Sequence, residues 1–552
     1  MFKKHLLSIL LITLITFNVN GQMLFKESDS LRGSLNKNRD WFDILSYDIS
    51  VIPDINNKTI EGNVVWKAKA VKASQDIQVD LQEPLIIDSV MIMMANQWEK
   101  VPFQREGNIA LVHHQKNMKL NADFSLWIYY HGKPREAIRP PWDGGWIWKK
   151  DSNGNPWVSV ACQGLGASVW YPCKDHQSDE PDLGAALNIY SPNNLKAIGN
   201  GRPGRADQDH WYRWVVRNPI NNYNIIPYIG DYVNWKETYK GLKGNLDVSY
   251  YVLREDSSKA VEQFKQVPKM LEAFEHWMGP YPFYEDGFKL VQSPHLGMEH
   301  QSAVAYGNRF KNGYLGRDLS GSGWGLKWDY IIVHESGHEW FANNITTKDI
   351  ADMWVHEGFT SYLESLYTEY FFGKIAADEY TYGLRNRIQN DVPIIGPYGI
   401  NREGSGDMYA KGAVMLHTIR KAINDDVLFR NIMIGLNKTF YHQTVTTEQI
   451  ENYISQQAGI NFSKVFDQYL RTTQIPQLVL QYDAKEKTLS YEWKNCIKGF
   501  NLPIHINYQD KLESLMPLDF QPKKRLIQQD HFDINAFSNA IEKLYYVKVV
   551  VE

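Results

Sequence analysis

The spacing of hydrophobic and polar positions along this chain changes twice. From about Ser46 to Leu253, short alternating stretches such as Tyr47–Ile52 are separated by turn residues, which predicts a β-rich region. From Ser257 onward, apolar residues recur every three or four positions, which predicts helices. After Pro476, strand-like alternation returns. The predicted order is therefore a β domain, a mainly helical domain and a small second β domain.

Several local signals refine this order. Asn153-Gly154 lies between two tryptophan-containing stretches and predicts a hairpin turn. Thr446 and Gln449 form a capping-box pattern at the start of a helix. The clearest helical periods cover residues 260–274, 330–343, 353–372, 413–423 and 450–457.

The length of 552 residues is too great for one hydrophobic core. We therefore expect an α+β multidomain protein. The predicted divisions are residues 1–21 (signal peptide), 22–255 (N-terminal β domain), 256–475 (helical domain) and 476–552 (C-terminal β domain).

The first residues have the pattern of a secretory signal peptide. Lys3 and Lys4 precede an apolar stretch over residues 6–17, which is too short to span a bilayer. We expect cleavage near Gly21 and export to a periplasmic or extracellular space; an uncleaved N-terminal anchor is the alternative. Later segments are not apolar enough to span a bilayer, so we expect no stable membrane insertion after the signal is removed.

The composition restricts the possible partners of the protein but does not indicate its function. The chain is 43% hydrophobic and 22% charged, with a formal net charge of -4, which argues against a nucleic-acid partner. Its three cysteines do not make a disulfide framework. Cys162 and Cys173 are close enough in sequence to pair in an oxidising compartment, but two buried thiols fit equally well. The oligomeric state is not readable from the sequence.

The candidate catalytic residues start with a metal-binding motif. His334 and His338 lie four residues apart within an HExxH sequence, so a helix places both imidazoles on one face. A catalytic zinc ion takes three protein ligands and keeps one open position. Glu357, in the next helical segment, is the expected third ligand for one zinc ion per chain. Glu335 lies beside a ligand and is expected to act as the general base toward the attacking water.

Further segments resemble a known family in order and spacing. The sequence is similar to the gluzincin aminopeptidases of the aminopeptidase N and leukotriene hydrolase type, which are zinc metallopeptidases. The segments that carry the resemblance are the HExxH motif with its downstream Glu357, Gly297–His300, Gly279–Phe283, Tyr409–Gly412, Cys162-Gln163 and Pro172–Asp175.

The resemblance implies roles for five more residues. Glu299 is expected to bind the free α-ammonium group of a peptide, and Gln163 to make a second polar contact with it. Gly297 and Met298 are expected on an edge strand, spanning about residues 297–306, that pairs with the substrate backbone. Tyr409 is expected to donate its hydroxyl to the oxyanion. An exposed carboxylate, a buried structural glutamine and a packed tyrosine are the corresponding structural alternatives.

The sequence also departs from the family pattern. His300 and His356 replace two family asparagines, and Ala410 replaces a glutamate. Residues 474–552 are shorter than the family's C-terminal helical domain, so we expect a more open cleft. Glu364 falls on the same helix face as Glu357 and is expected either to orient a ligand histidine or to be solvated.

Together these features predict a thermolysin-like catalytic domain between two β domains. The expected function is removal of N-terminal residues from peptides with a free N-terminus. Endopeptidase activity of the thermolysin type, epoxide hydrolysis and a non-catalytic peptide-binding role are the alternatives. The preferred N-terminal residue is not fixed by the sequence.

Overall fold

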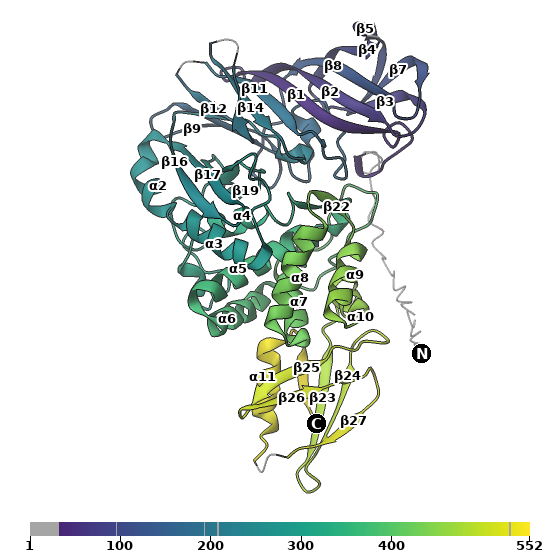
Figure 1. Cartoon of the computed structure of the whole chain (residues 1–552), viewed down its shortest axis with the longest axis vertical. Coiled ribbons are helices and arrows are strands. Elements are labelled where there is room, and N and C mark those ends of the chain that lie inside the picture. Colours follow the sequence, from purple (N-terminus) through teal and green to yellow (C-terminus); the bar gives the residue numbers. More distant parts are fainter. Residues whose placement is uncertain (1–31, 95, 193, 207–208, 529–530) are drawn as a thin grey trace, which may run out of the picture.

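The computed structural model describes residues 32–94, 96–192, 194–206, 209–528 and 531–552. The expected signal peptide lies outside the described residues. A β-rich region, a mainly helical region and a smaller region with a second set of strands follow one another along the longest axis of the molecule (Figure 1). The predicted α+β class and the predicted order of regions are confirmed.

Fifteen strands make up the N-terminal region as the structure describes it. They are β1 (Phe42–Asp54), β2 (Thr59–Ala70), β3 (Ser74–Asp80), β4 (Ile86–Met94), β5 (Gln97–Val101), β6 (Phe103–Glu106), β7 (Ile109–Met118), β8 (Asp123–Gly132), β9 (Gly145–Lys150), β10 (Pro156–Ala161), β11 (Ala185–Tyr190), β12 (Lys196–Ile198), β13 (Arg202–Pro203), β14 (Trp211–Val216) and β15 (Tyr228–Gly230).

The largest sheet of this region has eight strands in the order β13-β14-β11-β1-β2-β8-β4-β5. Alternate residues of β1 and β2 are buried, as the alternating sequence pattern predicts. A smaller sheet, β12-β15-β10-β9, contains the hairpin predicted at Asn153-Gly154. Its strand β10 ends two residues before Gln163, so this sheet sets the position of that residue.

A five-stranded sheet joins the β-rich and helical regions. Its strands are β16 (Tyr232–Gly241), β17 (Gly244–Leu253), β18 (Phe288–Gln292), β20 (Val304–Tyr306) and β19 (Gly297–Met298), in that spatial order. On β17, Tyr250 packs into the core of the helical region, whereas Tyr251 packs into the core of the β-rich region. The sheet therefore spans the division predicted at residue 255.

The predicted edge strand over residues 297–306 is only partly correct. Two short antiparallel strands, β19 and β20, occupy its ends, and a turn separates them. Ser302 in this turn has a φ of 56°, which is incompatible with a continuous strand. Gly297 and Met298 still lie on the edge of the sheet, because β19 is its last strand.

The helical region is built from nine α-helices in the described chain, together with the small strands β21 (Ile345–Thr347) and β22 (Gln443–Val445). The helices are α2 (Ser257–Gln263), α3 (Gln266–Met278), α4 (Tyr330–Gly337), α5 (Trp354–Phe372), α6 (Lys374–Leu384), α7 (Ala410–Ile423), α8 (Asp426–Thr439), α9 (Thr447–Ala458) and α10 (Ser463–Arg471). The capping box of Thr446 and Gln449 is present at the start of α9.

Two of these helices carry the metal motif. Helix α4 ends at Gly337, not at residue 343 as predicted, because the chain turns there toward β21. His338 caps the helix in a helical conformation, so it stays on the face of His334. Helix α5 crosses α7 at a pair of glycines: a Cβ on Gly412 would lie 2.8 Å from the Cα of Gly358. This close contact fixes the turn of α5 that carries Glu357.

The C-terminal region contains a helix that the β-only prediction did not include. Its strands are β23 (Gln477–Asp483), β24 (Thr488–Lys494), β25 (Ile504–Tyr508), β26 (Lys511–Leu515), β27 (Lys523–Leu526) and β28 (Lys548–Val551), and α11 covers Ile534–Leu544. Asp533 caps α11 by accepting from two backbone amides. In the described part of the chain, no helix combines the length and apolar character needed to cross a bilayer.

Candidate active site

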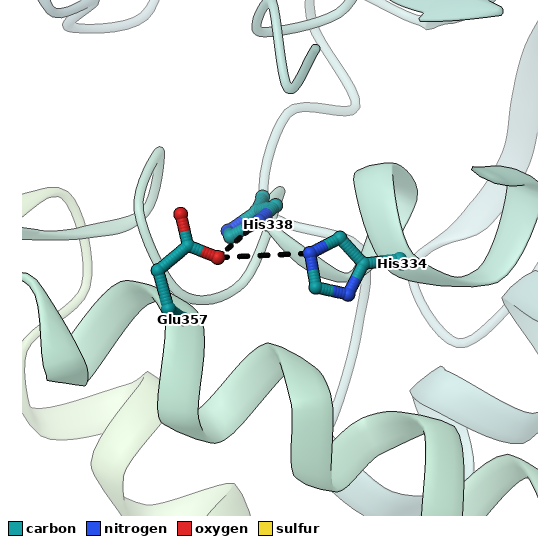
Figure 2. Close-up of side chains that lie close together, drawn as sticks. All are labelled: His334, His338 and Glu357. Carbon is teal, nitrogen blue, oxygen red and sulfur yellow. Dashed lines mark ion pairs between the residues drawn. The ribbon is translucent and has the colours of Figure 1, made fainter. Parts of the chain in front are cut away.

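Three side chains from two helices converge on one point. His334 and His338 come from α4 and its cap, and Glu357 comes from the first turn of α5. One carboxylate oxygen of Glu357, Oε2, lies 3.6 Å from Nε2 of His334 and 3.3 Å from Nε2 of His338 (Figure 2). All three side chains are buried. The structure therefore brings these three residues together, as the sequence predicts.

The residues fit a metal ion in their hydrogen bonding as well. Nδ1 of His334 bonds to Glu364 at 2.7 Å, and Nδ1 of His338 bonds to the Phe341 carbonyl at 3.0 Å. These bonds place the ring protons on Nδ1 and leave both Nε2 lone pairs facing Glu357. Oε2 of Glu357 is buried and has no hydrogen-bond donor among the described residues. Two imidazole nitrogens and one carboxylate oxygen are a donor set that suits zinc.

The electrostatics of Glu357 agree with this fit. Burial alone raises the pKa of its carboxyl, but the facing imidazoles of His338 and His334 outweigh burial and hold the pKa well below its usual value. Glu357 is therefore a carboxylate at neutral pH, as a metal ligand must be.

Glu335 lies on α4 between the two histidines and lines the same cleft as they do. Its carboxylate lies within 4.8 Å of ligand atoms of Glu299 and His338. Burial, opposed by the two histidines, raises the pKa of Glu335 to about 7. A Cβ on Gly297 would lie 2.6 Å from Oε1 of Glu335, so the missing side chain of this glycine leaves room for that carboxylate.

Glu299 lies at the junction of the β-rich and helical regions. Its side chain is buried, and Oε1 accepts hydrogen bonds from the Gln163 amide and, at 3.0 Å, from the Tyr223 hydroxyl. The Asn343 amide binds its backbone carbonyl at 2.8 Å. Gln163 and Tyr223 both come from the N-terminal region, so two regions together hold this carboxylate in place.

Tyr409 precedes α7 and faces the metal-binding group. Its ring stacks near that of His334, with centroids 6.1 Å apart, and 38% of the residue is exposed. Burial of the hydroxyl and the nearby Glu357 carboxylate raise the pKa of Tyr409 well above its usual value. The hydroxyl therefore keeps its proton and is available as a hydrogen-bond donor.

A single cleft of about 760 Å³ brings all nine predicted site residues together. Its lining includes Gln163, Gly297, Met298, Glu299, His334, Glu335, His338, Glu357 and Tyr409. The convergence of titratable side chains in one large cleft is typical of an active site.

Comparison with known proteins agrees with this geometry. Residues 263–469 match the family model described as "Peptidase family M1 domain". This segment is therefore similar to a family M1 peptidase domain. It contains the metal-binding group, Glu299, Glu335 and Tyr409, whereas Gln163 and Tyr223 reach it from outside the matched range.

Curated relatives with this similarity are peptidases and a leukotriene hydrolase. The chain is 22% identical over 365 residues to leukotriene A-4 hydrolase of Xenopus laevis, covering 61% of this chain and 57% of the relative. It is 22% identical over 520 residues to aminopeptidase N of Canis lupus familiaris, covering 86% of this chain and 48% of the relative. The chain thus spans about half the length of these relatives.

Solved structures give the same fold. An M1 zinc metallopeptidase from Deinococcus radiodurans superimposes with a TM-score of 0.66 at 17% identity, covering 79% of this chain and 95% of that one. A mutant of that enzyme bound to a Tyr-Ser-Ala substrate superimposes with the same TM-score. At this identity, the likeness shows the fold of the superimposed part of the chain and nothing beyond the fold.

The structure adds site residues that the sequence reasoning missed. Tyr223 holds Glu299, and Glu403 lines the cleft from the loop before Tyr409. Burial in the cleft, with the Glu357 and Glu299 carboxylates nearby, raises the pKa of Glu403 to about 7. Neither residue lies in a periodic segment or a motif of the M1 domain, so only its position in space reveals it.

The two histidines that replace family asparagines are not additional ligands. Nε2 of His356 accepts the backbone N–H of Thr347 at 2.9 Å, which places the ring proton on Nδ1. Burial lowers the pKa of His356 to about 3, so the ring stays neutral. His300 is buried against the Tyr228 hydroxyl. Cys162 and Cys173, whose pairing the sequence left open, are unpaired buried thiols.

Proposed function

We propose that the protein is an exported zinc aminopeptidase that hydrolyses the N-terminal peptide bond of peptides. One observation carries the exopeptidase assignment. Glu299 is a buried carboxylate fixed beside the metal-binding group by Gln163 and Tyr223. An anionic group at a fixed position near the metal suits the α-ammonium group of a peptide and limits how far the peptide can enter.

Substrate binding follows from the placement of β19. Glu299 pairs with the α-ammonium group, while the backbone at Gly297 and Met298 offers an open strand edge to the substrate backbone. The first carbonyl carbon then faces the three-ligand site, and later peptide bonds lie beyond it. Blocking the terminal amine removes the charge that Glu299 binds.

Chemistry at the carbonyl needs a base, a metal and an oxyanion donor. When bound, zinc supplies Lewis acidity and lowers the pKa of water to about 7. Glu335, whose pKa is raised to about 7, accepts the proton of the attacking water and returns it to the departing amine. The Tyr409 hydroxyl donates to the oxyanion that forms on the former carbonyl oxygen.

Aminoacyl chromogenic substrates, each with a free or an N-acetylated amine, test this function. We expect cleavage of the free form alone, loss of activity after metal chelation and recovery with zinc. Equal cleavage of acetylated substrates would instead favour an endopeptidase. Absence of cleavage, with metal binding intact, would favour the non-catalytic peptide-binding role.

Export is the second part of the proposal and rests on the N-terminal pattern of Lys3, Lys4 and the apolar residues 6–17. Expression of the full chain in a secreting host, with mass spectrometry of the mature N-terminus, tests it. We expect a chain that starts near Gln22 outside the cytoplasm. An intact N-terminus in the cytoplasmic fraction would contradict export without affecting the enzymatic assignment.

A further inference from the structure

The cleft that holds the metal-binding group has an acidic end. Glu299 and Glu403 both line it, and Oε1 of Glu403 lies 3.6 Å from the position of a Cβ on Gly164, next to Gln163. Burial raises the pKa of Glu403, and the nearby Glu357 and Glu299 carboxylates raise it further. This end has the charge and the position to take the amino terminus of a peptide.

Two arginines, Arg317 and Arg387, line the same cleft. Arg317 lies in the loop that leads to α4, and Arg387 ends a 3-10 turn after α6. Both are exposed, and within the described part of the chain neither guanidinium forms an ion pair with a carboxylate. The neighbouring Asp318 is engaged elsewhere, because its carboxylate accepts from Ser320 and Gly323.

A series of ring contacts links Arg317 to the metal-binding group. The Arg317 guanidinium lies over the ring of Tyr314, 5.7 Å from its centroid. Tyr314 packs edge-on against Tyr330 at 5.4 Å, and Tyr330 stacks on His334 at 5.1 Å. The Arg317 side chain therefore lies outward from His334, along the wall formed by these tyrosines, and Arg387 lines the same cleft.

Both arginines lie close enough to Tyr314 to influence its hydroxyl. After burial, which raises the pKa of Tyr314, the influences on it are Arg317 and Arg387, which lower it, and Glu335, which raises it. Arg317 and Arg387 therefore both lie near Tyr314, on the wall of the cleft.

Resting on the aminopeptidase function above, we propose that Arg317 and Arg387 bind the C-terminal carboxylate of a short peptide. The preferred substrates are then peptides with both termini free, short enough to lie within the cleft between its acidic and basic ends. Guanidinium groups suit this role because they bind a carboxylate through paired, charge-assisted hydrogen bonds. Longer peptides place a neutral backbone against the arginines and lose this contact.

The test compares Ala-Ala-Ala with its C-terminal amide, which differs only in the terminal charge. We expect the zinc-loaded protein to have a kcat/KM on the order of 10- to 100-fold higher for the free acid, the range of a charge-assisted contact. In the double variant Arg317→Gln/Arg387→Gln the acid-to-amide ratio falls toward one. The matched control Arg217→Gln, at an exposed arginine outside the cleft, keeps the ratio of the unmodified protein.

Two further arms separate the possible failures. Ala-Glu-Ala amide carries its carboxylate on a side chain; if it is preferred over Ala-Ala-Ala, the arginines recognise acidic side chains and the proposal is overturned. Equal rates for acid and amide in the unmodified protein also overturn it. If that same preparation cleaves an alanyl chromogenic substrate, the aminopeptidase function stands even when carboxylate binding is refuted. If it does not cleave this substrate, both proposals are overturned.

Discussion

Oε1 of Glu364 lies 2.7 Å from Nδ1 of His334, and its other oxygen accepts from the Tyr380 hydroxyl at 2.6 Å. The carboxylate is buried and held on both sides, so it fixes the orientation of the imidazole that faces Glu357. Of the two roles that the sequence left open for Glu364, the geometry favours orientation over solvation.

This relationship predicts that Glu364→Gln weakens zinc binding by about 10-fold, the lower end of the usual effect of such partners. An amide keeps the shape but accepts through one oxygen only. Competition with a chromophoric chelator measures the affinity. The exposed Glu448→Gln on α9 is the control; an unchanged affinity in Glu364→Gln would show that His334 needs no such support.

Glu335→Gln separates metal binding from catalysis. Glu335 is not one of the three converging ligands, so we expect a normal zinc content by elemental analysis. We expect kcat to fall on the order of 10²- to 10⁴-fold, because the amide cannot accept a proton. A variant with nearly normal turnover would refute the general-base role.

Gly297→Ala is expected to lower kcat/KM by about 100-fold, the usual effect of displacing a catalytic group by about 1 Å. The new methyl group would lie 2.6 Å from Oε1 of Glu335 and push that carboxylate out of place. Gly406→Ala has no neighbouring atom within 4 Å and serves as the control. Equal activity of the two variants would mean that Glu335 has room to move without loss.

The buried ammonium of Lys289 leads us to expect that the free energy of unfolding depends on pH. This ammonium is buried over the Trp214 ring and donates to the Gly201 carbonyl, and burial lowers its pKa to about 7. Between that value and the ordinary lysine pKa of about 10.4, the unfolded chain binds the proton more tightly than the folded chain. Stability therefore rises with pH across this window, by at most about 1.4 kcal/mol per pH unit.

Lys289→Met removes this contribution. Denaturant unfolding of both proteins from pH 7 to 10 measures it, and the difference between their slopes isolates Lys289 from other titrating groups. We expect the unmodified protein to gain stability relative to the variant as the pH increases. Parallel curves would show that Lys289 stays charged in the folded protein.

The sequence predicted the parts of the molecule that local patterns encode. The alternation in β1 and β2, the hairpin at Asn153-Gly154 and the capping box at Thr446 each depend on neighbouring residues. The HExxH spacing placed two imidazoles on one face for the same reason. The resemblance to a family added Glu299, Gln163 and Tyr409, which local periodicity does not indicate.

The remaining features depend on contacts between distant segments. Tyr223 and Glu403 join the site only after the β-rich and helical regions pack together, and no spacing rule relates either one to Glu299. Helix α4 ends early, and residues 297–306 split, because tertiary packing bends the chain there. Helix α11 had a local signal, since Ile534, Phe537 and Ile541 recur at helical spacing after the cap Asp533, but the strands around it dominated the prediction.

The residues that hold Glu299 come from a different region of the chain than Glu299 itself, and this has a consequence for the synthesis of the protein. Gln163 and Tyr223 leave the ribosome first, the metal ligands follow up to Glu357, and Tyr409 comes later still. Tyr545, in the C-terminal region, then donates a hydrogen bond to the backbone of α7 at Lys421. A nascent chain therefore lacks a complete set of cleft residues until Tyr409 has been made.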